Sequence, residues 1–525
     1  MGFSGAHGDG RSTRGHLRNH DGDGRHHRFQ FLHRWHRDVE EIRRRDLPRG
    51  LGPVGLFEGL SRHSSSVALI DTALGEWSYQ QLETAADTVA GGIERRSLIF
   101  CLCTNHVESV IGYVGFQRSH HVCLMLPSSV DEERLEQLST QFRPNFVWAP
   151  RERVMRQAIN TVHEGSEYRL TRVGTTTVEM HDDLALLMGT SGSTGSPMMV
   201  RQSHVNLAAN ANAIAHSLDL VESDRAITTL PMNYTYGLSI INSQLCVGGS
   251  VVLCDATLMD RKFWDDLSIS RATYFGGVPY TYQMLSRLGI KRLKGTNLRM
   301  MTQAGGKLSA DLVSKVHSEA TTLGIKFHVM YGQTEATARM SVLSSDDVPT
   351  HEDSIGRPIP GGRFRILDLE SDVELAEGET GELEYSGANV TLGYASSADE
   401  LDRADDFNGR LRTGDLARVD SDGFFYVVGR RKRFIKLFGN RVSLDHVEAH
   451  LQSKGLTAAC SGTDDLLQAF VEGVCDVTDV TNQLASFVGV HPSGVKVTII
   501  AELPRAESGK VLYSQLEKSS HNEST

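Results

Sequence analysis

The 525-residue chain lacks several features that would place it in particular classes of protein. No uninterrupted apolar run approaches the ~20 residues that cross a bilayer, so any membrane role would come through a substrate or partner. The net charge of −11 leaves no overall basic surface for nucleic acid. The seven cysteines show no metal-ligand spacing, which fits a reducing cytosol. We therefore expect a cytoplasmic protein without a nucleic-acid partner and without integral membrane association.

The first fifty residues lack lysine and apolar periodicity, and they are rich in arginine and histidine. This composition is typical of disordered sequence. Asp9, Asp21, Asp23 and Asp38 argue against a transit peptide, and no apolar segment follows that would make a secretory signal. His26 and His27 have no Cys or carboxylate partners at metal-ligand spacing. We expect residues 1–55 to be a disordered or extraneous tail.

From about Leu56, apolar strand-like runs alternate with helical patterns. The run 97–103 is followed by a helical pattern over 107–116. Further strand-like runs cover 226–230, 250–254, 272–276 and 326–330, each beside a helical stretch, as in buried parallel sheets. Short strands with Gly and Asp turns follow over 363–428. The pattern predicts α/β architecture.

A loop rich in glycine and hydroxyl groups follows the apolar run 184–188. Its sequence is Thr190-Ser191-Gly192-Ser193-Thr194-Gly195-Ser196-Pro197. We place it between that strand and a helix over 203–218, at a strand end where α/β sheets bind ligands. The glycines allow close backbone approach to an anion, and the hydroxyls donate hydrogen bonds. No Gly-Lys-Ser/Thr follows, so this is not a Walker A loop. The loop predicts a polyphosphate site rather than a flexible linker.

With this loop, the sequence resembles the adenylate-forming superfamily of acyl-CoA synthetases, nonribosomal peptide adenylation domains and luciferases. Five more motifs occur in the order of that superfamily: Tyr331-Gly332-Gln333-Thr334-Glu335, Gly381-Glu382-Leu383, Thr413-Gly414-Asp415, Gly429-Arg430-Arg431-Lys432, and Pro504-Arg505 with Ser508-Gly509-Lys510. The resemblance implies a large multi-subdomain N-terminal domain over 56–428, with mostly parallel sheets and a small β-barrel-like part. A hinge over 429–432 and a small mobile α+β domain over 433–525 would follow.

The resemblance also implies ATP and Mg²⁺ as cofactors. Glu335, a hard oxygen ligand, would hold the metal between phosphate oxygens. Tyr331 would face adenine, and Asp415 would accept hydrogen bonds from the ribose hydroxyls. The expected nucleotide and CoA-site residues are Thr190, Ser191, Gly192, Ser193, Thr194, Gly195, Gly305, Gly306, Lys307, Tyr331, Gly332, Asp415, Arg430, Lys436 and Gly439.

Lys510, by the same resemblance, is the mobile lysine that contacts the reacting carboxylate and the α-phosphate. Together with Thr334 and Glu335 it completes the expected catalytic set. Lys432 matches the hinge position, and Lys436 with Gly439 matches the loop used in the thiol step. Relatives of this kind rotate the small domain between the two half-reactions.

The segment Pro231-Met-Asn-Tyr-Thr-Tyr-Gly-Leu238 aligns with the stretch that lines the acyl pocket in the superfamily. Tyr234 replaces the usual histidine, and a phenol is bulkier and neutral near pH 7. We therefore predict a modest pocket with a hydrogen-bonding gate. The expected pocket residues are Tyr234, Tyr236, Gly277, Val278 and Ala304.

The loop departs from the resemblance at Met198 and Met199, where the superfamily has Lys-Gly. Arg201, three residues after Met198, is a candidate replacement for the missing cation. Its effect would depend on where the backbone directs the side chain.

Three functions compete. The leading hypothesis is an acid–thiol ligase, which makes an acyl-adenylate and pyrophosphate from ATP and a small carboxylic acid. It then transfers the acyl group to CoA or to the phosphopantetheine of an acyl or peptidyl carrier protein. The alternatives are an adenylate-forming amide synthetase and a degenerate nucleotide-binding protein with a regulatory role. Lys436 and the hinge favour a thiol acceptor, whereas intact Glu335, Asp415 and Lys510 argue against degeneracy.

Overall fold

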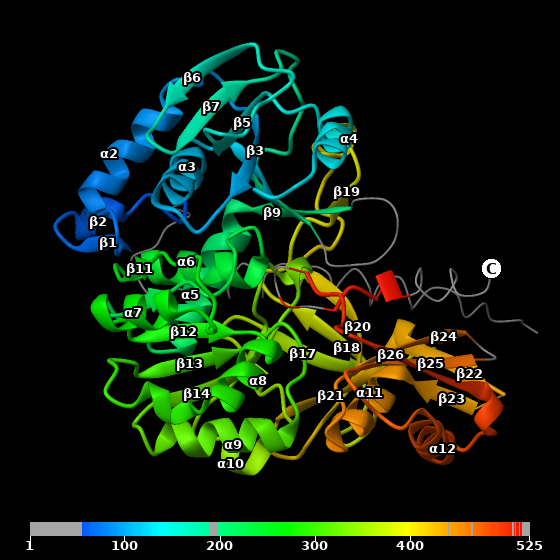
Figure 1. Ribbon diagram of the computed structural model, residues 1–525. Coiled ribbons are helices and arrows are strands. Elements are labelled where there is room, and N and C mark those ends of the chain that lie inside the picture. Colours follow the sequence, from blue (N-terminus) through cyan, green and yellow to red (C-terminus); the bar gives the residue numbers. More distant parts are fainter. Residues whose placement is uncertain are drawn as a thin grey trace, which may run out of the picture. The chain divides into compact units, whose positions relative to one another are not determined.

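Two large β-sheets with helices between and outside them dominate the structure, a computed structural model (Figure 1). It describes residues 55–189, 198–438, 440–463, 466–506, 509, 511–513 and 515–516, and only the backbone of residues 432, 434, 436, 440 and 441. The described residues all belong to one unit, Pro53–Thr525.

The first sheet has eight strands in the order β19-β9-β8-β4-β3-β5-β7-β6. Its centre is parallel, because β3 pairs in parallel with β4 and β5, and β4 with β8. Antiparallel strands continue it on both sides. The strands are β3 (Leu98–Cys103), β4 (Val122–Pro127), β5 (Phe146–Pro150), β6 (Asn160–Glu164), β7 (Tyr168–Arg172), β8 (Leu184–Gly189), β9 (Met199–Ser203) and β19 (Tyr394–Ala395).

The second sheet has nine strands in the order β16-β15-β14-β13-β12-β10-β11-β1-β2. The six strands from β14 to β1 are parallel to one another, and β15 and β2 extend them in antiparallel. The strands are β1 (Val67–Asp71), β2 (Gly75–Ser78), β10 (Arg225–Ile227), β11 (Ser250–Val252), β12 (Tyr274–Gly277), β13 (Met300–Gln303), β14 (Lys326–Tyr331), β15 (Ser341–Leu343) and β16 (Arg357–Pro358).

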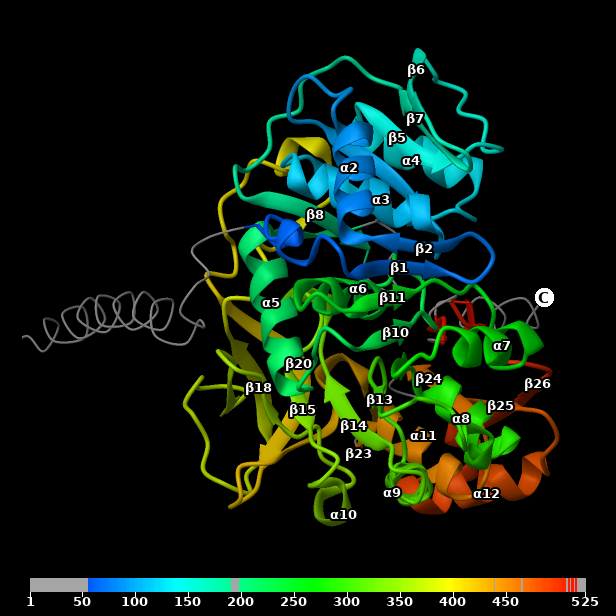
Figure 2. The same cartoon turned by 90° about the vertical axis from the view of Figure 1, so that its left-hand side faces the viewer.

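Four helices lie between the two sheets, as Figures 1 and 2 show: α2 (Tyr79–Ala90), α3 (Val107–Arg118), α5 (His204–Ser217) and α6 (Thr235–Cys246). One hydrophobic cluster contains buried side chains from all four helices and from strands of both sheets. Helix α4 (Glu132–Phe142) packs on the outer face of the first sheet. The outer face of the second sheet is covered by α7 (Arg261–Ile269), α8 (Pro279–Leu288), α9 (Ala310–Thr321) and the short α10 (Val348–His351).

Local sequence explains why these elements form where they do. Ser78 is the N-cap of helix α2: its side chain accepts from Gln81 N while the Gln81 side chain accepts from Ser78 N, a capping box. Strand β3 is buried along its whole length, as expected of a central parallel strand. The strands predicted over 97–103, 226–230, 250–254, 272–276 and 326–330 are confirmed, with ends that differ by a few residues.

A third sheet over residues 363–430 is antiparallel, in the order β17-β18-β20-β21. Its strands are β17 (Arg363–Leu367), β18 (Gly381–Ser386), β20 (Arg410–Val419) and β21 (Phe425–Arg430). In the described part of the chain, no pairing joins β17 to β21. The part that we expected to be barrel-like is therefore an open sheet of short strands.

The C-terminal residues form an α+β arrangement, as expected. It contains the hairpin β22 (Phe434–Leu437) and β23 (Asn440–Ser443), α11 (Leu444–Ser453), α12 (Val477–Val488), and a sheet of β24 (Ala458–Thr463), β25 (Leu466–Glu472) and β26 (Val495–Ile500). This part has its own hydrophobic cluster. A domain boundary at 429–432 stays a prediction.

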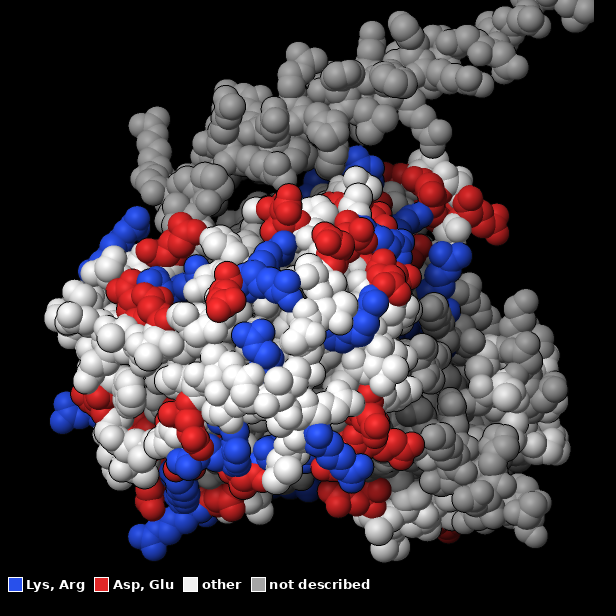
Figure 3. Space-filling model, turned by 90° about the horizontal axis from the view of Figure 1, so that it is seen from above, with Lys and Arg blue, Asp and Glu red and all other residues white. Residues whose placement is uncertain are grey.

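None of the described helices is long and apolar enough to cross a membrane. On the face seen in Figure 3, Lys and Arg side chains are interspersed with Asp and Glu. That face carries no large patch of either sign.

Candidate active site

Three neighbouring parallel strands of the second sheet end at one edge. Strands β12, β13 and β14 end at Gly277, Gln303 and Tyr331, and Gly277 pairs with Gln303. The residues that follow these strands, 278, 304–306 and 332–335, therefore gather where α/β sheets bind ligands. Five of the residues that the sequence predicted for the nucleotide and the acid lie in these three segments: Val278, Ala304, Gly305, Gly306 and Gly332.

Asp415 is a buried carboxylate surrounded by donors, and only 2% of its side chain is exposed. It lies in β20 opposite Arg430 of β21, whose Nε donates to Oδ1 at 2.9 Å. Tyr331 Oη donates to Oδ2 at 2.5 Å, and Gln333 Nε2 donates to the same oxygen at 2.9 Å. Asp415 raises the pKa of Arg430. Burial, reinforced by Asp415, raises the pKa of Tyr331 well above its usual value, so the phenol stays a donor.

Gly305 occupies a position that only glycine fits easily. Its φ is +84°, in the left-handed region. A Cβ atom there would lie 2.5 Å from Tyr234 Oη and 3.1 Å from Val278 Cγ1. Gln303 Nε2 donates to the Gly306 carbonyl at 2.8 Å and fixes the turn. The backbone of the Gly305–Gly306 pair is thus held against two predicted pocket residues.

Glu335 lies in the 3₁₀ turn Thr334–Ala336 that follows β14. Tyr394 Oη donates to Glu335 Oε1 at 2.8 Å. Burial, with a contribution from Glu335, raises the pKa of Tyr394, so this donor stays protonated. Thr334 Oγ1 is 3.1 Å from Thr235 Oγ1 at the start of α6. The hydroxyl groups of Tyr394 and Thr235 therefore orient Glu335 and Thr334, two of the expected catalytic residues.

The chemistry around Glu335 fits a magnesium ion. No group of three or more His, Cys, Asp or Glu side chains in the described ranges could hold a metal. Mg²⁺ is commonly held by one or two carboxylates together with substrate phosphates and water. A single positioned glutamate is consistent with a metal that arrives with ATP.

The predicted acid pocket is a tightly packed aromatic and aliphatic cluster. Tyr236, Val278 and Ala304 are buried in one hydrophobic cluster, with Tyr234 packed against it. Tyr236 Oη donates to the Thr302 carbonyl at 2.9 Å. Burial raises the pKa of Tyr234, so this phenol is neutral, as predicted. A Cβ atom on Gly277 would lie 2.8 Å from Thr281 Cγ2, so the strand end has no room for a side chain.

Gly509 brings the C-terminal part against this pocket. A Cβ atom there would lie 2.9 Å from Val278 Cγ2, and its φ is +76°. Arg505 Nη1 donates to the Gly509 carbonyl at 3.1 Å, and its guanidinium stacks over the Tyr280 ring at 5.1 Å. The backbone that immediately precedes Lys510 therefore contacts the pocket wall.

The chain matches known proteins over most of its length. Residues 56–395 match the family model described as AMP-binding enzyme. The chain belongs to the AMP-binding enzyme family. It is similar to a 2-succinylbenzoate–CoA ligase of Geobacillus sp., with 32% identity over 351 residues, 64% of this chain and 69% of the relative. It is also similar to a sulfoacetate–CoA ligase of Cupriavidus necator, with 31% identity over 343 residues, 63% of this chain and 66% of that relative.

A solved structure shares the fold over nearly the whole chain. O-succinylbenzoate coenzyme A synthetase from Bacillus subtilis, in complex with ATP and magnesium ion, matches with a TM-score of 0.70 and 22% identity. The match covers 88% of this chain and 99% of that one. This AMP-binding enzyme therefore has the fold of an adenylate-forming enzyme beyond the residues of the family model.

The signature loop of this AMP-binding enzyme, Thr190–Pro197, lies outside the described residues. Its flanks are described: β8 and β9 are antiparallel, and Gly189 pairs with Met199. The loop therefore connects two antiparallel strands, and the expectation of a direct strand-to-helix connection is wrong. Strand β9 intervenes before α5, and Ser203 caps that helix by accepting from Asn206 N.

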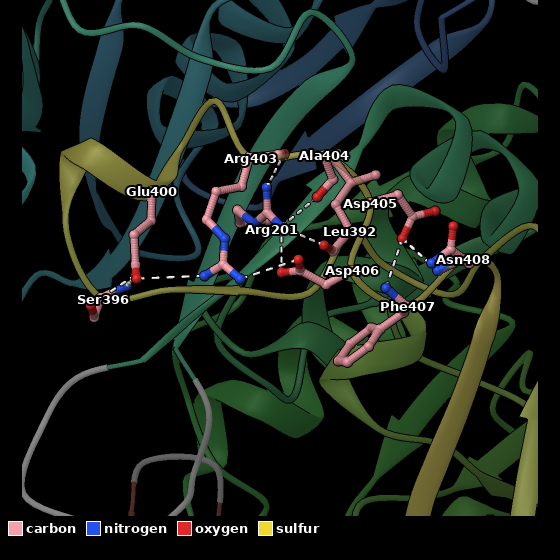
Figure 4. A network of polar contacts seen from close by, with 10 residues as sticks. All are labelled: Arg201, Leu392, Ser396, Glu400, Arg403, Ala404, Asp405, Asp406, Phe407 and Asn408. Atoms are coloured by element: carbon pink, nitrogen blue, oxygen red, sulfur yellow. Dashed lines mark hydrogen bonds and ion pairs between the residues drawn. The ribbon is translucent and has the colours of Figure 1, made fainter.

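The Arg201 side chain is buried and bonded to the segment 392–406, so it does not replace the missing loop lysine (Figure 4). Its side chain is 0% exposed. Its Nη2 donates to the carbonyls of Leu392 and Ala404 at 2.5 and 3.0 Å, and to Asp406 Oδ2 at 2.9 Å. Nη1 donates to the Arg403 carbonyl at 2.5 Å. Arg201 thereby ties β9 to the segment 392–406.

Several predicted residues have other environments or cannot be placed. Lys307 forms an ion pair with Asp353 at 2.8 Å, with both side chains about half exposed. Lys510 and Gly439 lie outside the described residues. Lys432 and Lys436 lie in the turn Arg431–Arg433 and in β22, but their side chains are not described.

Sequence reasoning missed three residues at this edge of the sheet. Gln333 stands inside a recognised motif, and its Nε2 also bonds the Thr413 carbonyl at 3.0 Å. No sequence motif includes Tyr394, which contacts Glu335 from the distant strand β19. Arg339 follows the same motif closely and is buried, with 1% exposure.

Proposed function

We propose that this AMP-binding enzyme is an AMP-forming acid–thiol ligase. A carboxylate oxygen of a small acid attacks the α-phosphorus of ATP, pyrophosphate leaves, and an acyl-adenylate forms. The thiolate sulfur of CoA then attacks the acyl carbon, AMP leaves, and a thioester forms. Membership of the family and its similarity to two CoA ligases support this proposal.

One observation carries the proposal most directly: Gly509 packs on Val278 of the pocket. The first step brings two anions together, so the site must supply positive charge at the point of attack. Lys510 is the next residue along the chain. We propose that its ammonium group contacts the carboxylate and the α-phosphate.

Asp415 and Tyr331 are proposed to hold the nucleoside. An ionised carboxylate offers about four lone-pair sites, and three protein donors already approach Asp415. A ribose hydroxyl would take the remaining site or displace a donor. Arg430 is the donor that a ribose hydroxyl would displace, because 58% of the Arg430 side chain is exposed.

Glu335 is proposed to ligate magnesium, with Tyr394 orienting the carboxylate through Oε1. The metal, when bound, would neutralise charge on the phosphates. Thr334 lies beside it and would donate to a phosphate oxygen.

CoA is the proposed acceptor, and the phosphopantetheine of a carrier protein is the second choice. We further propose a cytoplasmic location and a hinge at 429–432, about which the small C-terminal domain rotates between the half-reactions. Lys436 and Gly439 would then contact the thiol substrate.

ATP–pyrophosphate exchange with a panel of carboxylic acids tests the proposal, followed by addition of CoA and product mass measurement. Exchange without a thioester would indicate an amide synthetase. ATP binding without exchange would indicate a degenerate nucleotide-binding protein. Lys510→Ala should slow adenylate formation strongly and leave ATP binding intact, whereas Lys454→Ala, an exposed control, should change neither.

A further inference from the structure

Arg339 carries a buried positive charge that no described acidic side chain neutralises. Its side chain is among the largest fully buried ones, together with Arg201. Arg201 pairs with Asp406 at 2.9 Å, but no ion pair among the described residues includes Arg339. Arginine does not deprotonate in proteins, so the charge remains.

Every described partner of the Arg339 guanidinium is neutral. Nη2 donates to Tyr274 Oη at 3.2 Å, and Nη1 contacts Met330 Sδ, a weak acceptor, at 3.2 Å. Cζ lies 4.8 Å from the centre of the Tyr236 ring. Burial raises the pKa of Tyr236, so this ring is not a phenolate. Nε is buried and finds no hydrogen-bond partner in the part of the chain that the structure describes.

The neighbours of Arg339 place it in the wall of the predicted acid pocket. Tyr236, Tyr274 and Met330 belong to the same hydrophobic cluster as Val278 and Ala304. A cation thus stands inside a cluster that is otherwise apolar and aromatic.

The backbone contacts of residue 339 do not explain why it is arginine. Its carbonyl accepts from Asn210 Nδ2 at 2.8 Å and from Asn389 Nδ2 at 3.2 Å, and any residue would provide that acceptor. An unpaired buried cation is costly, so a neutral side chain would be more stable here. None of the described residues supplies the anion that would neutralise the guanidinium.

We propose that Arg339 pairs with a second anionic group of the acid substrate, distal to the carboxylate that is activated. The substrate class is therefore a dicarboxylic acid or an acid with a comparable distal anion. The planar guanidinium fork matches a carboxylate in a bidentate pair. This inference rests on the proposed function, because it assigns the substrate of the same site.

Exchange kinetics with matched acids provide the first test. Succinate and butyrate differ only in the distal group, as do glutarate and pentanoate, and 3-sulfopropionate replaces the distal carboxylate by a sulfonate. The wild-type kcat/KM should favour a diacid over its monoacid by roughly 100-fold, and Arg339→Met should abolish that preference. Arg339→Lys should recover part of it, and the KM for ATP should not change in either variant.

Arg287→Met is the matched control, because Arg287 is an exposed arginine on α8. It should keep the full diacid preference. A wild-type enzyme that uses monoacids as well as diacids would overturn the inference and leave the proposed function standing. An Arg339→Met variant with an unchanged diacid preference would also overturn it.

Ligand-induced thermal shifts of the full chain, with a non-hydrolysable ATP analogue present, separate this inference from the proposed function. Succinate should raise the Tm of the wild type but not that of Arg339→Met, and butyrate should raise neither. That pattern without exchange would support the anion site and refute acid activation. Equal responses to succinate and butyrate in the wild type would overturn the inference, even if Arg339→Met fails to fold.

Discussion

Gly305→Ala is the perturbation whose magnitude follows most directly from the structure. The methyl group would force an L-residue into the left-handed region at φ +84°, at a cost of about 1–2 kcal/mol. It would also stand 2.5 Å from Tyr234 Oη, and such overpacking typically costs about 1–3 kcal/mol. We expect both penalties to lower the free energy of unfolding.

Gly295→Ala separates the two contributions. Gly295 has the same φ of +84°, but apart from its chain neighbours no described residue has an atom within 4 Å of a Cβ built there. Its replacement should therefore show the backbone strain alone. Tyr234→Phe removes the clashing oxygen, so Tyr234→Phe/Gly305→Ala should regain most of the difference between the two alanine variants. The next contact, Val278 Cγ1 at 3.1 Å, limits full recovery.

Urea denaturation of the four variants and the wild type measures these differences through the shift of the transition midpoint. ATP–pyrophosphate exchange on the same samples shows whether the substitutions also change the activity of the candidate active site. Equal destabilisation by Gly305→Ala and Gly295→Ala would refute the reasoning. So would a double variant no more stable than Gly305→Ala.

Three further predictions concern a buried arginine, a carboxylate and a histidine. Arg201→Met should lower the free energy of unfolding by on the order of 3 kcal/mol, since Asp406 and three carbonyls lose their donor; urea denaturation measures this. Asp415→Asn should raise the KM for ATP roughly tenfold or more, because a charged acceptor is lost; exchange kinetics measure this. Burial lowers the pKa of His328 to about 4, so the unfolded chain binds its proton first, and stability falls as pH drops from 6.5 towards 4. His328→Asn should flatten that slope in Tm measurements.

Each of the predictions for Arg201, Asp415 and His328 would be contradicted by a different result. Arg403→Met removes a half-exposed arginine of the same network and should cost less than about 1 kcal/mol. If it costs as much as Arg201→Met, burial is not the reason for the effect. An unchanged KM in Asp415→Asn would remove the ribose role. An equally steep pH slope in His328→Asn would assign the proton uptake to other groups.

Strands that consist almost entirely of apolar residues could be predicted from the sequence. Residues 97–103 and 184–188 are continuous apolar runs, and both form central strands. Strand β9 could not be predicted in this way. Its residues Met199–Ser203 include Arg201 and Gln202, whose burial depends on acceptors in distant segments.

The family and the order of its motifs could be recognised from the sequence, because the motifs consist of particular residue types in a fixed order. The positions of the charged side chains became known from the three-dimensional packing. Arg201, the expected replacement cation, turns into the interior, because carbonyls of 392–406 and Asp406 meet it there. Arg339, which no motif predicted, is buried against Tyr236 of α6 and Met330 of β14. A side chain's partners come from segments far apart in the chain, and sequence spacing does not record them.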